Sequence, residues 1–143
     1  MWGMTTAELV RAYTTSLLAL TVWREARGEG IEGMRAVACV VRNRVLAGWF
    51  GGSWRGNLIA KNQFTSMSVT GDGNLVLWLD PNEKLGAAAL AVAASVYSGG
   101  QADVTGGALY YENPEVATSK WFIQNVRNKR PKVATIGRHT FYA

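Results

Sequence analysis

The sequence has few of the residues that usually carry redox or metal chemistry. Its 143 residues include one cysteine, Cys39, and one histidine, His139. A single cysteine cannot form an internal disulfide, so the fold has to be stable without one in either a reducing or an oxidising compartment. One histidine and one cysteine leave only scattered carboxylates as metal ligands, which argues against metal catalysis.

Long hydrophobic runs are also missing. The most apolar early stretch, Thr14 to Trp23, is too short to span a bilayer. No basic segment, apolar run and small-residue cleavage site occur together at the N-terminus. We therefore expect a soluble protein without a secretion signal and without stable membrane insertion.

The charge balance is basic. Fifteen Lys and Arg against ten Asp and Glu give a formal net charge of +5, which favours an anionic partner. Nucleic acid, teichoic acid, lipopolysaccharide and the peptide stems of peptidoglycan all qualify. The length and the 48% of hydrophobic residues suit one compact domain over residues 1–143.

Apolar spacing predicts three main helices. The first runs from Thr6 to Arg27 and stops near Gly28 and Gly30, and the second runs from about Ile31 to Ala47. A third follows Asp80-Pro81-Asn82-Glu83, which supplies a cap, a proline in the first turn and a returning glutamate. The expected apolar faces are Val10, Tyr13, Leu17 and Leu20 in the first helix, Ile31, Met34, Ala38, Val41 and Val45 in the second, and Leu85, Ala89, Val92 and Val96 in the third. The Ala-rich run 87–94 indicates close helix packing.

The remaining segments are shorter. Gly48 to Gly73 combines Gly, Ser and Asn with aromatic residues, which is typical of a folded functional loop region. Ala108 to Tyr111 resembles a short strand and Ser119 to Val126 a short helix. Val133 to Tyr142 resembles a hairpin that turns near Gly137.

Glu25 is the first candidate for chemistry. It follows Leu18 by seven residues and Val22 by three, so it prolongs the buried stripe to the end of the first helix. Partial burial and the negative end of the helix dipole would both keep its carboxyl protonated near neutral pH, as a general acid requires. Nearby Arg24 and Arg27 would oppose this effect. A solvated Glu-Arg pair is the alternative.

A nucleophilic pair of Cys39 and His139 is a weaker candidate. Cys39 lies between Ala38 and Val40 on the second helix, where a small buried thiol is the usual finding. We expect this cysteine to be structural.

Several segments together resemble the spore cortex-lytic enzyme and cell wall hydrolase family. They are Glu25–Gly30 (EARGEG), Glu32–Ala38 (EGMRAVA), Val41–Val45 (VRNRV), Gln63–Ser66 (QFTS), Asp103–Tyr111 (DVTGGALYY), Trp121 and Ile136–Tyr142 (IGRHTFY). These motifs follow the order of the family over nearly the whole chain. The family often has a histidine or a small residue where this chain reads Tyr110-Tyr111-Glu112-Asn113, so the roles there stay open, and we expect Glu112 on the surface.

The resemblance implies a lysozyme-like α+β domain, small and mainly helical, with a short β-hairpin or sheet. It implies cleavage of the bond between N-acetylmuramic acid and N-acetylglucosamine in peptidoglycan, with no metal and no other cofactor. Glu25 matches the family's catalytic glutamate, and family members are lytic transglycosylases, which form a 1,6-anhydromuramic product. A single carboxyl suffices for this reaction, because it protonates the leaving oxygen and then accepts the proton of the sugar's own C6 hydroxyl. Glu29 should lie at the entry to the second helix, near free backbone N–H groups, and stay ionised.

The candidate substrate-binding residues are Gln63, Phe64, Thr65, Ser66, Tyr110, Tyr111, Trp121, His139 and Tyr142. Gln63, Thr65 and Ser66 would donate hydrogen bonds to the sugar or form a turn, and Phe64 would pack beneath the loop. The tyrosines and Trp121 would stack on sugar faces or fill the core. His139 is expected to hydrogen-bond across the hairpin.

Three alternatives remain open. The first is a hydrolytic muramidase of the same fold, and the second is a non-enzymatic basic module that binds nucleic acid, supported by Arg127, Lys129, Arg130 and Lys132. The third is a wall-binding or virion protein without catalysis. We favour the enzyme, with peptidoglycan strands and the anionic wall surface as partners and no nucleic acid.

The compact single-domain form, without a spore-type signal peptide or a separate wall-binding repeat, indicates a phage endolysin. Such a protein would be monomeric and would accumulate in the host cytoplasm. It would then act on the wall after release by a holin-type, membrane-permeabilising partner.

Overall fold

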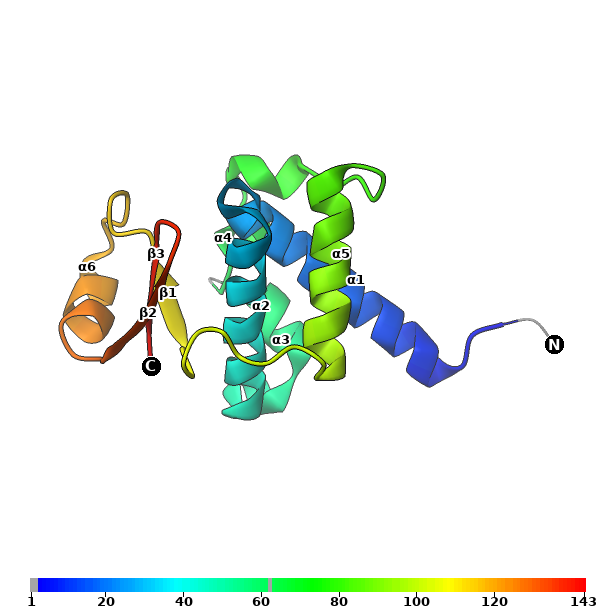
Figure 1. Ribbon diagram of the computed structural model, residues 1–143, viewed down its shortest axis with the longest axis horizontal. Coiled ribbons are helices and arrows are strands. Elements are labelled where there is room, and N and C mark those ends of the chain that lie inside the picture. The colour runs from blue at the N-terminus through cyan, green and yellow to red at the C-terminus, as the bar shows by residue number, and fades with distance from the viewer. Residues whose placement is uncertain (1–2, 62) are drawn as a thin grey trace.

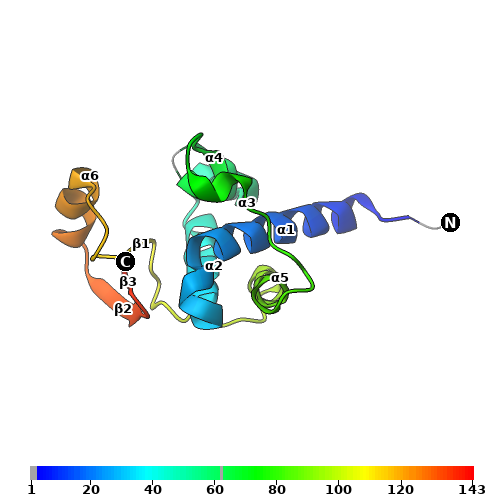
Figure 2. The ribbon, with the colours of Figure 1, turned by 90° about the horizontal axis from the view of Figure 1, so that it is seen from above.

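The computed structural model describes residues 3–61 and 63–143. Its helices and strands are α1 (Thr6–Ala26), α2 (Gly30–Leu46), α3 (Trp54–Ile59), α4 (Thr65–Ser68), α5 (Lys84–Ser98), β1 (Tyr110–Glu112), α6 (Lys120–Phe122), β2 (Lys132–Ile136) and β3 (His139–Tyr142). Single helical turns of other types are η1 (Arg27–Glu29), η2 (Trp49–Gly52), η3 (Gly73–Val76) and a π-helical turn (Ile123–Arg127). The sheet and α6 lie beside the helical part, at the end away from the N-terminus (Figures 1 and 2). This is the mainly helical α+β architecture that the sequence predicted.

The first two long helices begin and end close to the predicted residues. Thr5 caps α1: its hydroxyl accepts from the Glu8 N–H at 3.2 Å, and the Glu8 carboxylate accepts from the Thr5 N–H at 2.7 Å. The helix ends at Ala26, one residue before the predicted end, and α2 starts at Gly30, whose φ of 71° suits a glycine.

The predicted cap of the third long helix was wrong. Asp80 does not cap α5; its carboxylate accepts the N–H of Asn82 and closes a turn at 2.8 Å. The helix starts at Lys84, and Glu83 is the N-cap, accepting from the Gly86 N–H at 3.0 Å. The chain folds back so tightly that a Cβ at Gly86 would collide with the Asp80 carbonyl. Residues 80–82, which were expected to begin the helix, therefore form a turn before it.

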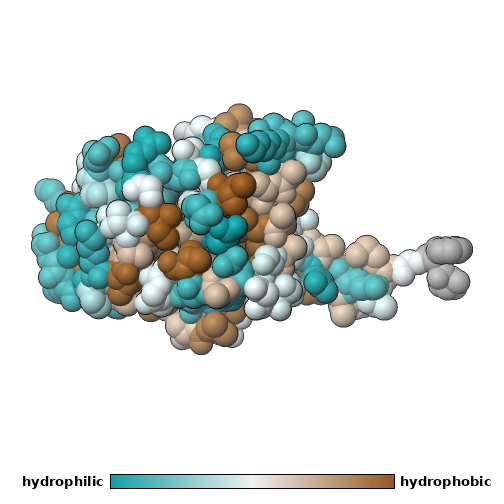
Figure 3. All heavy atoms as spheres, viewed as in Figure 1, coloured by the Kyte–Doolittle hydropathy of each residue, from teal (hydrophilic) through white to brown (hydrophobic). Residues whose placement is uncertain are grey.

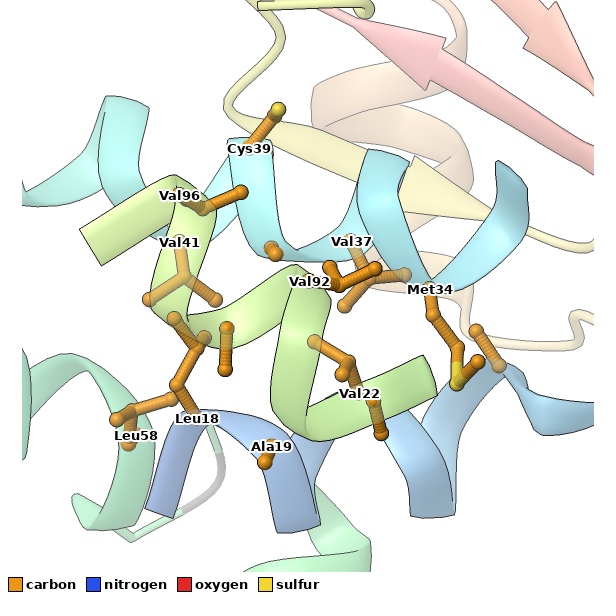
Figure 4. Packing of buried hydrophobic residues seen from close by; sticks show 14 of the residues in the cluster. Leu18, Ala19, Val22, Met34, Val37, Cys39, Val41, Leu58, Val92 and Val96 are labelled. Atoms are coloured by element: carbon orange, nitrogen blue, oxygen red, sulfur yellow. The ribbon is translucent and has the colours of Figure 1, made fainter. Parts of the chain in front are cut away.

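The core lies where α1, α2 and α5 meet, with α3 closing one side. Leu18 and Val22 of α1, Met34, Val37 and Val41 of α2, and Val92 and Val96 of α5 belong to one buried cluster (Figure 4). Ala89 and Ala93 are fully buried, which confirms the close packing expected of the Ala-rich run. Cys39 is buried and donates to the Ala102 carbonyl, as expected for a structural thiol. Within the described residues, no helix has both the length and the apolar character that crossing a bilayer requires.

Some residues predicted to be buried are exposed. Val10 and Tyr13 keep 53% and 50% of their surface, because the first part of α1 extends beyond the other helices (Figures 1 and 2). Ile31 keeps 38%, and Val45 and Leu85 are half-buried. Periodicity places residues on one face of a helix, but only the neighbouring helices determine how much of that face is covered.

The Gly- and aromatic-rich segment 48–73 folds into short helices: η2, α3, α4 and the first residue of η3 lie in it. Ser53 caps α3 by accepting from the Gly56 N–H at 3.0 Å. Phe64 is 3% exposed and packs in the core, and the Trp54 ring lies 5.3 Å from the Tyr97 ring of α5. These aromatic contacts hold the segment against the core and α5.

The sheet has the order β1-β3-β2 and is antiparallel throughout. The predicted hairpin is confirmed, since β2 and β3 turn at Gly137, whose φ is 58°. The strand predicted over Ala108 to Tyr111 lies at Tyr110–Glu112 in the structure. The short helix predicted over Ser119 to Val126 corresponds to α6 and the π-helical turn that follows it. Phe141 is fully buried in a cluster with Ala36 and Val40, which attaches the sheet to α2.

The expectation that Glu112 is a surface residue was wrong. Glu112 is 6% exposed, and its carboxylate accepts from Arg127 Nε at 2.9 Å and Nη2 at 2.6 Å and from the Tyr142 hydroxyl at 2.7 Å. These bonds hold the pKa of Glu112 below its ordinary value, the Arg127 hydrogen bond being the largest cause. The partners lie 15 and 30 residues away, beyond the reach of a local pattern.

We predict that Glu112→Gln lowers the free energy of unfolding by about 1–3 kcal/mol near neutral pH, because hydrogen bonds to a buried charge are lost. The pKa is depressed in the folded protein, so this stability is present above the ordinary carboxyl pKa and is lost as pH falls through the folded value. Urea unfolding near neutral pH and in acid should therefore show a difference that shrinks in acid. Glu115→Gln, an exposed control, should change stability by less than about 0.5 kcal/mol.

Candidate active site

A cleft of about 860 Å³ separates the helical part from the sheet and α6. The ends of α1 and α2 form one wall with Glu25 and Arg44, and β1 forms another with Tyr110 and Tyr111. The residues that line the cleft are Glu25, Arg44, Trp49, Gln63, Phe64, Thr65, Tyr110, Tyr111, Glu112, Asn113, Val116, Ala117, Thr118, Ser119, Trp121 and Phe122. The cleft thus joins segments from across the chain around Glu25.

Glu25 occupies the place that its spacing predicted. Val22 and Leu18, one and two turns earlier, are fully buried, and Glu25 is half-buried where α1 leaves the core. Burial, and then the negative charge of Asp72, raise the pKa of Glu25 to about 7. The Ser66 hydroxyl and the Arg44 guanidinium act in the opposite direction. A carboxyl in this environment holds a proton near neutral pH.

The arginines next to Glu25 in sequence point elsewhere. Arg24 is buried and donates to the carbonyls of Ser66, Leu75 and Leu77 at 2.9–3.0 Å. Arg27 donates to Asn74 at 2.9 Å, and its guanidinium lies 4.3 Å from the Trp23 ring centre. The solvated Glu-Arg pair considered from the sequence is therefore not formed by these residues.

Glu29 has a different environment from Glu25. It accepts from the backbone N–H of Arg138 at 3.1 Å and from Arg138 Nε at 2.7 Å, and the backbone bond is the largest cause of its lowered pKa. Glu29 precedes α2, as expected, but it makes no side-chain cap to the helix. It stays ionised because it anchors the β2–β3 turn, and it does not line the cleft.

Most of the predicted substrate-binding residues meet in the cleft. Gln63, Phe64, Thr65, Tyr110, Tyr111 and Trp121 line it, and Trp121 is 61% exposed. Ser66 is 1% exposed and does not line the cleft, but its hydroxyl is close enough to lower the Glu25 pKa without a fully formed hydrogen bond.

His139 and Tyr142 are buried in β3 and do not line the cleft. The His139 ring makes no side-chain hydrogen bond across the hairpin with any described residue. It packs at 5.2 Å from the Tyr111 ring, and its Nδ1 has no partner there. Burial lowers the pKa of His139.

Sequence reasoning missed Arg44, Trp49 and Asp72. Arg44 had a detectable signal, because it follows Val37 by seven residues and Val41 by three and therefore continues the buried face of α2. Asp72 reaches Glu25 only through the fold of the segment between α4 and η3, and nothing local marks it. Among residues 3–61 and 63–143, no three His, Cys, Asp or Glu side chains are grouped so that they could hold a metal ion.

The fold and its cleft define a small, mainly helical α+β domain of the lysozyme-like class. The chain belongs to the cell wall hydrolase family, whose sequence model matches residues 28–142. It is 38% identical over 125 residues to a spore cortex-lytic enzyme of Oceanobacillus iheyensis and 37% identical to one of Bacillus subtilis. Each match covers 87% of this chain but 40% and 36% of the relative, so the chain spans about two fifths of the length of these relatives.

Two solved structures have the same fold. One is the catalytic domain of the germination-specific lytic transglycosylase SleB from Bacillus anthracis, with a TM-score of 0.70, 33% identity and coverage of 99% of this chain and 98% of that one. The other is the catalytic domain of the Bacillus cereus SleB protein, with a TM-score of 0.67, 36% identity and coverage of 92% and 91%. The expected family and fold are confirmed.

We predict that Asp72→Asn lowers the pKa of Glu25, because the substitution removes a nearby negative charge. Carbon-13 NMR of the glutamate carboxyls measures this pKa directly. The other groups that act on Glu25, namely Ser66 and Arg44, are unchanged in this variant. Asp80→Asn, in an exposed turn, is the control, and an equal pKa of Glu25 in both variants would contradict the role of Asp72.

We predict that Glu25→Gln stabilises the folded protein by on the order of 3 kcal/mol near pH 8. The folded pKa of about 7 lies above the ordinary value of 4.5, so ionisation of Glu25 destabilises the fold as pH rises between these values and the cost persists above them. Below the ordinary value the two proteins should be nearly equal. Urea unfolding across this range measures the difference, and the exposed control Glu32→Gln should show no such trend.

Proposed function

We propose that this chain is the catalytic domain of a peptidoglycan lytic transglycosylase that cleaves the bond between N-acetylmuramic acid and N-acetylglucosamine. Family membership and the fold shared with a lytic transglycosylase domain support this proposal. The observation that carries it is the half-buried Glu25 carboxyl, with a pKa of about 7, at the wall of a wide cleft. The family match begins after Glu25, so the role of this residue rests on its geometry and on the motif around it.

In the proposed reaction Glu25 acts twice. Its carboxyl gives a proton to the glycosidic oxygen, the C1–O bond breaks, and N-acetylglucosamine leaves as a 4-hydroxyl sugar. The C6 hydroxyl oxygen of the muramyl residue then bonds to C1 and gives its proton to the Glu25 carboxylate. Bond making balances bond breaking, Glu25 is regenerated, and no water is consumed.

The other carboxylates near the cleft favour this single-residue mechanism. A hydrolase normally uses a second carboxylate as nucleophile or to activate water. Both oxygens of Glu112 are bound by Arg127, one of them also by Tyr142, which leaves this carboxylate poorly suited to either task. Glu112 therefore acts as part of the cleft wall.

Asp72 is the observation that favours the second candidate, a hydrolytic muramidase. It is close enough to raise the pKa of Glu25 and is itself kept ionised, mainly by a hydrogen bond from Thr65. However, its oxygens accept from Thr65 and Asn74 at 2.7 and 2.8 Å, and it does not line the cleft. We therefore favour the transglycosylase.

The substrate-binding proposal follows the cleft lining. Trp121, on the rim, and Tyr110 present aromatic faces for sugar stacking, while Gln63 and Thr65 supply hydrogen bonds beside Glu25. Phe64 serves as a buried support. His139 and Tyr142 are proposed to hold β3 against Tyr111 and Glu112 and not to touch the sugar.

The basic residues are placed to approach an anionic wall. Lys129, Arg130 and Lys132 are exposed in or before β2, and hydrophilic residues cover much of this end of the molecule (Figure 3). The phage-endolysin role, monomeric state and holin-assisted release from a host cytoplasm stay predictions. Export of the protein in a host without phage proteins would contradict the release model.

We predict that the protein releases 1,6-anhydromuropeptides from purified Gram-negative peptidoglycan and that Glu25→Gln lowers the rate by at least about 10²-fold, because proton donation is lost. Mass spectrometry of the soluble products measures both. Glu29→Gln is the matched control and should keep the products of the wild type. Reducing-end muropeptides would instead identify a hydrolytic muramidase, and the absence of products from every variant would favour a non-enzymatic binding module.

A further inference from the structure

Arg44 is a buried cation in the cleft that the proposed proton transfers do not use. It lies near the end of α2, is 7% exposed, and lines the cleft together with Glu25 and Tyr111. Its Nε donates to the Leu109 carbonyl at 2.8 Å, and its guanidinium lies 4.9 Å from the Trp49 ring and 5.6 Å from the Phe64 ring. These contacts hold the guanidinium plane in one orientation.

The terminal nitrogens of Arg44 are left open. Among the described residues, neither Nη1 nor Nη2 has a hydrogen-bond partner, and no carboxylate lies within ion-pair distance. Arg24, which is equally buried, uses Nε, Nη1 and Nη2 to hold three carbonyls. A guanidinium that only supports the fold uses all of its nitrogens in hydrogen bonds, as Arg24 does. Nη1 and Nη2 of Arg44 therefore remain available as donors at the cleft.

The charge of Arg44 restricts what these donors can bind. Glu25 is neutral while it holds its proton and cannot pair with the guanidinium. Positive charge develops at the sugar C1 during cleavage, and a cation placed against C1 would oppose the reaction. The partner should therefore be an oxygen acceptor displaced from C1, and amide carbonyls of the N-acetyl and lactyl groups are the acceptors that peptidoglycan offers there.

We propose that Arg44 is a substrate-positioning residue that donates from Nη1 and Nη2 to an amide carbonyl oxygen of the bound glycan beside Glu25. The proposal rests on the proposed function for its substrate class. The rigid, two-pronged donor, whose orientation is held by contacts with the Trp49 and Phe64 rings, would fix the sugar relative to Glu25. An ammonium group would keep the charge but not this planar geometry.

The test measures binding without cleavage, in the Glu25→Gln background. The variants are Arg44→Met and Arg44→Lys, and Arg42→Met is the matched control, since Arg42 lies on the same helix and donates to the Gln101 carbonyl away from the cleft. Calorimetry with soluble peptidoglycan strands should show binding at least about ten-fold weaker in Arg44→Met. Arg44→Lys should be intermediate, and Arg42→Met should equal the parent.

A hexamer of N-acetylglucosamine identifies which carbonyl is bound, because it has N-acetyl groups but no lactyl group. Loss of affinity for both ligands in Arg44→Met indicates the N-acetyl carbonyl. Loss for peptidoglycan strands alone indicates the lactyl carbonyl. Unchanged affinity for both ligands in Arg44→Met and Arg44→Lys would overturn the proposal.

A second readout separates this role from a structural one. With Glu25 intact, Arg44→Met should raise the pKa of Glu25 in the NMR titration, because Arg44 lowers it. A loosened cleft would hydrate Glu25 and lower its pKa instead, and that result would overturn the proposal for Arg44→Met. If the wild type forms no anhydro products but Arg44→Met still binds strands more weakly, the proposed function fails and the role of Arg44 in binding stands.

Discussion

The half-buried carboxyl of Glu25 is the constraint around which the rest of the molecule is arranged. The two preceding turns of α1 are packed against α2 and α5, so the helix leaves the core at a fixed point and carries Glu25 to the cleft. Burial and the charge of Asp72 then raise its pKa to about 7. The ionised carboxylate is less stable there than in water, so the fold is less stable near neutral pH than a neutral side chain would allow.

Arg24 connects this electrostatic environment to the fold. Its guanidinium binds the carbonyls of Ser66, Leu75 and Leu77, and these bonds hold the segment with Ser66 and Asp72 against the end of α1. Ser66 and Asp72 act on the Glu25 pKa in opposite directions. The residue directly before Glu25 therefore affects its chemistry through the loop that it anchors, while Arg44, from another helix, supplies the nearby positive charge.

The cleft contains two carboxyls in opposite states. Glu25 meets desolvation and a like charge, whereas Glu112 receives hydrogen bonds from Arg127 and Tyr142, so its pKa is lowered. Environments that separate the pKa values of two carboxyls are a common way to assign one of them as the acid. Here Glu112 is bound into the wall formed by β1, β3 and the π-helical turn, which favours Glu25 as the proposed acid.

The sequence alone determined the three long helices, the final hairpin and the place of Glu25 at a helix end, because apolar spacing, caps and glycines act over a few residues. It also identified the family through motifs spread along the chain. The sequence-based prediction placed the α5 cap at the wrong residue and Glu112 on the surface. It did not identify Arg44 or Asp72 as site residues. The cap was displaced by a tight local turn at Asp80. The other features depend on partners such as Arg127 or Glu25 that are distant in sequence, and on which helix faces have neighbours. Only tertiary structure brings such groups together, so only it could decide the burial, pairing and pKa of the residues in the cleft.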